Sequence, residues 1–306
     1  MTTTTIPYVG VPGLRLIRSE VRKIFSTNAW WLFVIASLPI TGIALLANMA
    51  QARDQLNFAR DTTPFEAPQG VPPDQLAQIQ EEFARQHDMH RVLVESAANI
   101  YTSGQFFGLV LVMLLGALVI TNEFQYQTAT ATFLTTPRRS RVVFGKLVAG
   151  IGLALMFWVL AQAATLITGL IFFKNMGLDN GLGEWPVQRA IIFNGTAYLL
   201  WAVFGFGLGT LIRSQIGTVV TGMAIYLVGY IGGIGFFVLV RTYLIHGDWV
   251  LTSAVIMPSI ASQIMISPEK LYPQSAVWWV GALSMIGWSL LAGAIGLLLT
   301  RRRDIS

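Results

Sequence analysis

Two histidines are the first candidates for chemistry in this chain. His87 and His90 are three residues apart and flank Asp88. On a helix both imidazoles would lie on one face, where they could ligate a metal ion. A histidine pair on a solvated helix is more often simply hydrated, and this pair lies in a hydrophilic, acidic stretch. The sequence therefore predicts no metal site.

An acid/base pair is the second candidate. His246 and Asp248 are two residues apart, so their side chains would not face each other on a helix. Outside residues 50–100, the other acids on the predicted external side are scattered along the chain: Asp179, Glu184 and Glu269. A polytopic lipid-modifying enzyme would need such groups clustered at one membrane face, so it stays a less favoured alternative.

The chain lacks both a thiol group and a nucleotide-binding P-loop motif. The chain has no cysteine, which excludes a thiol nucleophile and Cys-ligated metal. A phosphate-binding P-loop reads G-x-x-x-x-G-K-[ST], but the only Gly-Lys pair, Gly145–Lys146, is followed by Leu147. We expect no catalytic, cofactor-binding or metal-binding residue, and any ATP-derived energy must come from another chain.

The amino-acid composition excludes several classes of protein. Of its 306 residues 54% are hydrophobic and only 11% are charged, whereas a soluble domain carries about a quarter of its residues as Asp, Glu, Lys or Arg. A soluble enzyme, a disordered protein and a nucleic-acid binder are therefore poor interpretations, despite the net charge of +5.

The charge-free stretches predict an all-α polytopic membrane protein with six transmembrane helices. A helix needs about 20 mostly apolar residues to cross the hydrocarbon core. Because Phe106–Ile120 is shorter than this, the span that contains it is expected to begin nearer Tyr101. The six apolar runs are Ala29–Met49, Phe106–Ile120, Leu147–Phe173, Ala190–Ile212, Ile216–Val240 and Val277–Leu299.

Lys and Arg set the predicted orientation. They concentrate before residue 28, in 122–146 and at 301–303, and cytoplasmic flanks carry this excess, so both termini are expected in the cytoplasm of a cell-membrane protein. A seventh span at 249–268 would put 301–303 outside. That stretch also contains Pro258 and Pro268. We therefore predict a re-entrant pair of half-helices within an external segment 249–275.

Two further segments have their own patterns. Residues 12–28 combine apolar residues at helical spacing with basic ones, which predicts an amphipathic helix lying on the inner leaflet; an ordinary extension of the first span is the alternative. Residues 50–100 are hydrophilic and are predicted to form an external loop with a helix from Asp74 to about Ser96. The basic residues of the first segment are Arg15, Arg18, Arg22 and Lys23.

The predicted spans contain no ionisable residue in their cores. Intramembrane ionisable groups mark proton relays and ion pathways, so a proton-coupled transporter or an intramembrane hydrolase has no obvious groups to use. Uncharged polar residues either line a path or, more often, form hydrogen bonds between helices. These residues are Gln162, Thr165, Asn194, Thr218 and Thr221.

The segment 122–141 lies on the predicted cytoplasmic side. It is rich in Thr and Gln, poor in charge until its arginines, and interrupted by a proline that breaks a helix. A positive-inside loop is one interpretation; a compact helical element pressed on another protein is the other. Its marked residues, together with nearby Lys146, are Glu123, Phe124, Thr136, Pro137, Arg138, Arg139 and Arg141.

This pattern resembles the E-[FY]-x…T…P-x-S-R…K motif of permease subunits of type-2 ATP-binding-cassette (ABC) transporters. The predicted six spans, the basic leader and the segment before the last span resemble that family too, so the likeness covers essentially the whole chain. The long first external loop departs from minimal members. It makes the chain more similar to prokaryotic drug and antibiotic exporters than to polysaccharide exporters.

The resemblance implies a set of partners. A second permease copy would pair with this one, as a homodimer or a heterodimer, and two copies of a separate cytoplasmic ATPase would bind ATP and Mg²⁺. The segment 122–141 would act as the coupling helix, 12–28 as the connecting helix, and 249–268 as the external gate. Spans two and five would line the path.

The function that follows is ATP-driven export of an amphipathic or hydrophobic substrate, such as a drug, antibiotic or lipid. No nucleic acid is expected as a partner, whereas membrane lipid is. A non-transporting membrane sensor or assembly subunit on the same scaffold is the main alternative.

Overall fold

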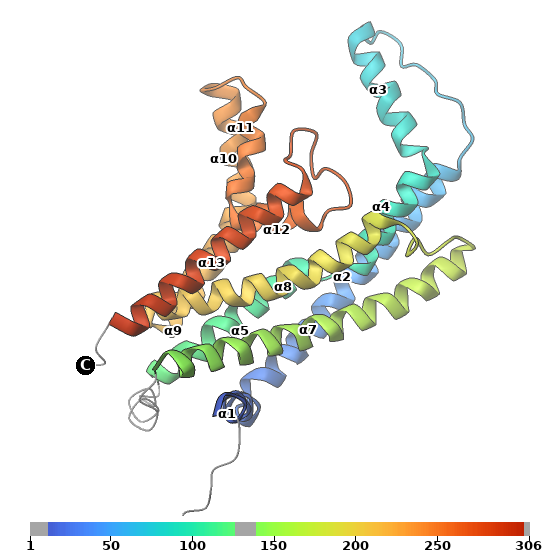
Figure 1. Ribbon diagram of the computed structural model, residues 1–306. Coiled ribbons are helices and arrows are strands. Elements are labelled where there is room, and N and C mark those ends of the chain that lie inside the picture. The colour runs from blue at the N-terminus through green and yellow to red at the C-terminus, as the bar shows by residue number, and fades with distance from the viewer. Residues whose placement is uncertain (1–11, 126–138, 303–306) are drawn as a thin grey trace, which may run out of the picture.

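The computed structural model describes residues 12–125 and 139–302, and these residues form helices without any strand (Figure 1). The first half contains α1 (Pro12–Ser26), α2 (Ala29–Arg60), α3 (Pro73–Gln86), α4 (Met89–Tyr101), α5 (Gln105–Gln125) and α7 (Arg139–Met176). The second half contains α8 (Trp185–Ile212), α9 (Gln215–Met223), the π-helix η1 (Ala224–Val228), α10 (Gly229–Tyr243), α11 (Trp249–Thr252), the 3₁₀ turn η2 (Ser253–Ile256), α12 (Pro258–Ile266) and α13 (Trp278–Arg302).

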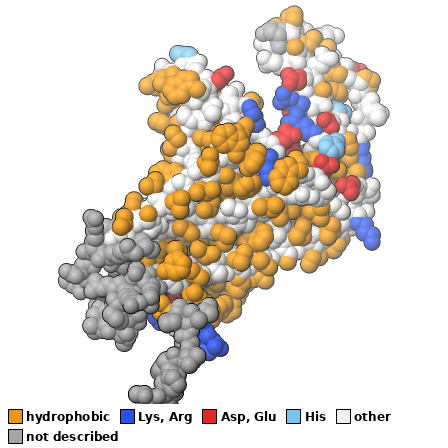
Figure 2. All heavy atoms as spheres, in the orientation of Figure 1, with side chains coloured by type: hydrophobic (Ala, Val, Ile, Leu, Met, Phe, Trp, Pro, Cys, Tyr) orange, Lys and Arg blue, Asp and Glu red, His pale blue; other side chains and the backbone are white. Residues whose placement is uncertain are grey.

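Within residues 12–125 and 139–302, six helical stretches are long and apolar enough to cross a membrane. They are α2, α4 with α5, α7, α8, α9 through α10, and α13. Each coincides with one of the six apolar runs, apart from Val277, which precedes α13, and this confirms the prediction of six apolar helices. Hydrophobic side chains cover most of the visible bundle, whereas charged ones gather at its upper right, with a few basic ones at its lower edge (Figure 2). This is the surface of a multi-pass membrane protein.

The bundle has two ends, one near α1 and one near α3. The α1 end holds α1, the last turn of α5 and the first turn of α7 (Figure 1). The α3 end holds α3, α4 and α12 (Figure 1). α8 runs between them and packs against α5, α7 and α13.

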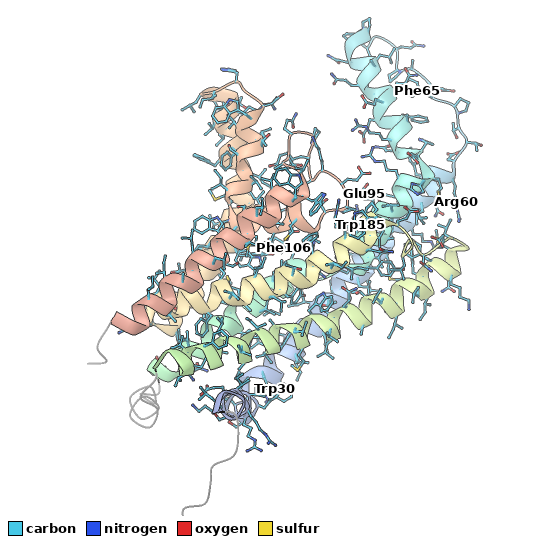
Figure 3. The ribbon with its side chains drawn as sticks, viewed as in Figure 1. Trp30, Arg60, Phe65, Glu95, Phe106 and Trp185 are labelled. Atoms are coloured by element: carbon cyan, nitrogen blue, oxygen red, sulfur yellow. The ribbon has the colours of Figure 1, made fainter. Side chains whose placement is uncertain are left out.

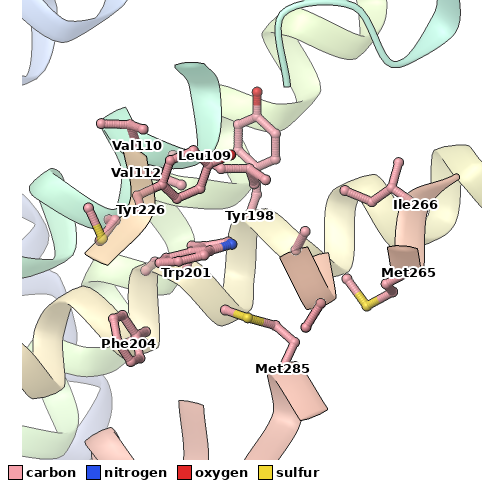
Figure 4. Close-up of a cluster of buried hydrophobic side chains, with 14 of the residues drawn as sticks. Leu109, Val110, Val112, Tyr198, Trp201, Phe204, Tyr226, Met265, Ile266 and Met285 are labelled. Atoms are coloured by element: carbon pink, nitrogen blue, oxygen red, sulfur yellow. The ribbon is translucent and has the colours of Figure 1, made fainter. Parts of the chain in front are cut away.

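Glycines let α8 come close to its neighbours. A Cβ at Gly205 would lie 1.9 Å from the carbonyl oxygen of Met113 on α5, and one at Gly207 would lie 2.4 Å from that of Ala292 on α13. Small residues at such contacts allow close backbone packing in membrane helices. Around them lies a core of large side chains, including Tyr198, Trp201 and Tyr226 (Figure 4).

The burial of the spans is uneven. α8 and the α4–α5 span are mostly buried, whereas α2 and the α9–α10 span bury few of their side chains. Leu46 on α2 and Ile231 and Phe236 on α10 are among the exposed apolar residues. These two spans therefore leave long apolar faces open to lipid or to another protein.

The hydrophilic insert differs from its prediction in two ways. α2 continues to Arg60 rather than ending near Met49, because Ala52, Leu56 and Ala59 extend its apolar stripe and pack against α4. The single helix predicted at 74–96 is two helices, α3 and α4. Asp88 separates them, since its Oδ1 accepts from the Arg91 N–H at 3.1 Å and caps α4.

The predicted half-helices at 249–268 are present as short segments. α11 with η2 and α12 are bent by 101° at the break between Ile256 and Pro258. Every residue of α12 is buried, so this segment is an integral part of the bundle rather than a surface loop. The geometry is that of a broken span or a re-entrant loop.

Candidate functional site

α1 packs crosswise against the beginning of α7 at the α1 end. Leu16 faces Gly145, where an added Cβ would lie 3.3 Å from the leucine side chain. Because Gly145 has no side chain, α1 can pack closely against α7 at this point. Leu16, Glu20 and Ile24 follow at spacings of four, so they form one stripe of α1.

The middle member of this stripe is a buried acid. Glu20 is 3% exposed and Lys146 of α7 is 1% exposed. The Lys146 Nζ donates to Glu20 Oε2 at 2.5 Å, and the Lys23 Nζ donates to Oε1 at 2.9 Å. We call the contact between Glu20 and Lys146 the α1–α7 ion pair. Separating the two residues would leave an uncompensated buried charge on each helix, so the contact resists movement of α1 away from α7.

Sequence reasoning picked out Lys146 but missed Glu20. The signal was available: Glu20 is the only acid in a basic helix, and it occupies a position on the apolar stripe. A carboxylate in that position must find a cation or a set of donors. Its partner is 126 residues away in the chain, which no local pattern specifies.

The two ends of the predicted coupling segment meet at the α1 end. Ile120 of α5, Val143 of α7 and Phe206 of α8 form one small buried cluster. Glu123 and Phe124 belong to the last turn of α5, and Arg139 and Arg141 to the first turn of α7. Thr136, Pro137 and Arg138 lie outside the described residues.

The basic residues of α1 are divided between two roles. Lys23 contacts Glu20, as above, whereas Arg18 and Arg22 are exposed. Arg15 belongs to the same helix. At its end, Phe25 and Trp30 pack edge to face with 5.0 Å between ring centroids, and Trp30 Nε1 donates to the Phe25 carbonyl at 3.2 Å (Figure 3). These two contacts between Phe25 and Trp30 stabilise the turn between α1 and α2.

Most of the polar residues singled out within the spans have hydrogen-bond partners in the bundle. Gln162 Nε2 and Thr165 Oγ1 both donate to the carbonyl of Tyr101, at 3.0 and 2.9 Å. They satisfy the backbone where the chain breaks between α4 and α5. Thr218 donates to the Ser214 carbonyl at 2.7 Å. Asn194 is buried with its Oδ1 unpartnered, and Thr221 is half-buried.

A second polar cluster lies nearer the α3 end and was not predicted. Gln105 Nε2 donates to Gln263 Oε1 at 3.2 Å, and Gln263 Nε2 donates to the Tyr226 hydroxyl at 3.4 Å. The Tyr226 ring contacts Trp201 and Phe106, with centroids 4.8 and 5.1 Å apart. This glutamine–tyrosine cluster joins α5, α12 and η1. Tyr226 belongs to the π-helical turn η1, and its side chain is buried in the core.

The segment between α12 and α13 is held in place by hydrogen bonds from the buried Arg189 and the half-buried Tyr272. The Arg189 guanidinium donates to the carbonyls of Ser267 and Pro268 at 3.0 and 2.6 Å, and its Cζ lies 5.1 Å from the Trp278 ring centroid. Tyr272 donates to the Leu251 carbonyl at 2.9 Å. Partial burial raises the pKa of the Tyr272 phenol, so it remains a donor at neutral pH.

The histidines do not come together. The His87 ring stacks on Phe83 with centroids 3.9 Å apart. His90 Nε2 lies 3.2 Å from Glu184 Oε1 instead. Asp248, the partner considered for His246, accepts from Arg241 Nη2 at 2.6 Å. No group of three or more metal-ligating side chains occurs in residues 12–125 and 139–302.

No protein-family model matches the sequence, and no curated protein matches it significantly.

Proposed function

We propose that the chain is the membrane-spanning subunit of an ATP-driven exporter. It would sit in the cell membrane with its α1 end in the cytoplasm and move an amphipathic or hydrophobic substrate outward. The observation that carries the proposal is the α1–α7 ion pair, because it joins the basic leader helix to the helix that follows the segment 122–141. A force applied to that segment is then transmitted to α1 and α7 together.

The motive force in this proposal comes from a separate ATPase with bound ATP and Mg²⁺. It would dock on the segment 122–141, for which the sequence motif is the support. Closure of the ATPase dimer would push the beginning of α7, and α1 would follow because a buried ion pair resists separation. The small cluster of Ile120, Val143 and Phe206 would pass the movement to α5 and α8.

The exit side in this proposal is the α3 end. α12 is buried and bent away from α11, and the glutamine–tyrosine cluster holds it to α5 and η1. Opening for substrate release would require these hydrogen bonds to break. Hydrogen bonds between membrane helices are individually weak, at about 0.6 kcal/mol, so the closure is reversible.

A second copy is the proposed neighbour of the exposed spans. α2 and α9–α10 bury few of their side chains within the chain. Two copies packed through these faces would cover apolar surface and enclose a path between them.

The experiment is reconstitution. We expect the purified chain alone to hydrolyse no ATP, and its complex with an ATPase subunit to show substrate-stimulated hydrolysis and substrate flux in proteoliposomes. Uphill movement of substrate by the chain alone would refute the proposal. An ATPase complex that forms but supports no flux with any compound would instead favour the sensor or assembly role.

A further inference from the structure

The α1–α7 ion pair fixes which way α1 faces. Positions two residues apart on a helix are about 200° apart around its axis. With Glu20 turned inward, Arg18 and Arg22 therefore point away from the bundle, and both are exposed. They are four residues apart, so their side chains are neighbours on one face.

The same rotation places an apolar strip beside the arginines. Ile17, Val21 and Phe25 lie at about 60°, 100° and 140° from Glu20, followed by Arg18 and Arg22 at about 160° and 200°. Phe25 is 43% exposed. Ser19 and Ser26 follow on the far side of the arginines, and both are exposed. Around the helix the order is thus apolar, guanidinium, hydroxyl.

This order matches the depth profile of a membrane surface. Apolar side chains of an interfacial helix enter the acyl boundary and polar ones face water, which leaves the guanidinium groups at the level of the phosphates. Phe25 and Trp30, packed together at the α1–α2 turn, are the aromatic residues that anchor a helix at this depth. The first span begins directly after the turn.

Neither Arg18 nor Arg22 has a carboxylate partner among the described side chains. Guanidinium groups pair with phosphate through two parallel hydrogen bonds. An anionic lipid offers such phosphates at the right depth and in a leaflet of negative potential. An acidic protein surface would also attract two arginines, but it would not use the apolar strip beside them.

We propose that Arg18 and Arg22 form a binding site for the headgroup of an anionic phospholipid of the inner leaflet. The proposal rests on the cytoplasmic placement of α1 under the proposed function. The bound lipid would hold the outer side of α1 to the membrane surface while the ion pair holds its inner side to α7. α1 would then be fastened both to the bundle and to the leaflet.

Native mass spectrometry of the full chain in detergent, titrated with dioleoyl phosphatidylglycerol or dioleoyl phosphatidylcholine, tests the site. We compare wild type with Arg18→Gln/Arg22→Gln and with a control, Arg85→Gln/Lys270→Gln, which removes the same charge from exposed residues at the α3 end. One basic residue near an anionic surface is worth a factor of about five in binding. We therefore expect phosphatidylglycerol affinity to fall about 25-fold in the first variant only.

Three results would overturn the site. They are equal losses in the two variants, no preference for phosphatidylglycerol over phosphatidylcholine in wild type, and full competition by inorganic phosphate at equal concentration. An Arg18→Lys/Arg22→Lys variant should lose part of the affinity, since charge remains but the two-bond geometry does not. The assay contains no ATPase and measures no transport, so its outcome is independent of the proposed function.

Discussion

Replacing Lys146 with methionine removes the ammonium group beside Glu20 while keeping a long apolar side chain. The carboxylate is 3% exposed, so water cannot take over the role of the lysine. Lys23 remains 2.9 Å from Oε1, but its side chain is 52% exposed and it is the weaker partner. Removing one member of a buried pair costs about 3–5 kcal/mol. Because Lys23 stays, we expect a loss of about 3 kcal/mol.

The assay is reversible unfolding in mixed micelles by added dodecyl sulfate, followed by helical circular dichroism. Glu20→Leu should also lower the free energy of unfolding, since it removes the buried carboxylate from beside Lys146. The double variant Glu20→Leu/Lys146→Met should regain most of the loss, because two apolar residues can replace a buried pair at little cost. The coupling energy of this double-mutant cycle is then about 3 kcal/mol.

A matched control is Arg241→Met. Its partner Asp248 is 67% exposed and Arg241 itself is 40% exposed, so this ion pair should contribute no more than about 1 kcal/mol. If Lys146→Met cost no more than the control, or if the two changes at Glu20 and Lys146 simply added, the ion pair would not be what holds α1 to α7.

Three further substitutions test other contacts. Gly205→Leu should prevent assembly of the bundle, because a side chain there meets the backbone of Met113 at 1.9 Å; monodispersity on size exclusion reports it, and Gly152→Leu on α7, with open space around it, should behave as wild type. Gln263→Leu removes both hydrogen bonds of the glutamine–tyrosine cluster and should destabilise α12 by about 1–2 kcal/mol; hydrogen exchange of residues 258–266 measures it, and unchanged exchange would contradict the role of the cluster. Arg189→Met frees the carbonyls of Ser267 and Pro268 and should speed proteolysis in 267–277, whereas Arg53→Met should not.

The six apolar helices were predictable because the membrane imposes one local rule. A helix in lipid must be long and nearly free of charge, and each of the six runs satisfies that rule without reference to any other. The amphipathic pattern of α1 is local in the same way. Glycines such as Gly205 could be expected at helix contacts, although the partner backbone could not be named from the sequence.

What could not be predicted depends on pairs that are distant in the chain. Glu20 meets Lys146 across 126 positions, and Gln105 meets Gln263 across 158. Nothing in either local segment specifies the other. The extension of α2 to Arg60 has the same origin, because the charged residues after Met49 favour a loop until α4 is known to cover Leu56. The π-helical turn at 224–228 has no sequence signal of its own.

α8 is the fourth apolar span to leave the ribosome, yet it is the one around which α5, α7 and α13 pack. α5 and α7, which precede it in the chain, therefore enter the membrane before the helix that each of them contacts most. Glycine contacts with α5 and α13 then close on either side of α8. We therefore expect the bundle to pack fully only after α8 has entered the membrane, and a chain that stalls before residue 212 to be a substrate for quality-control proteases.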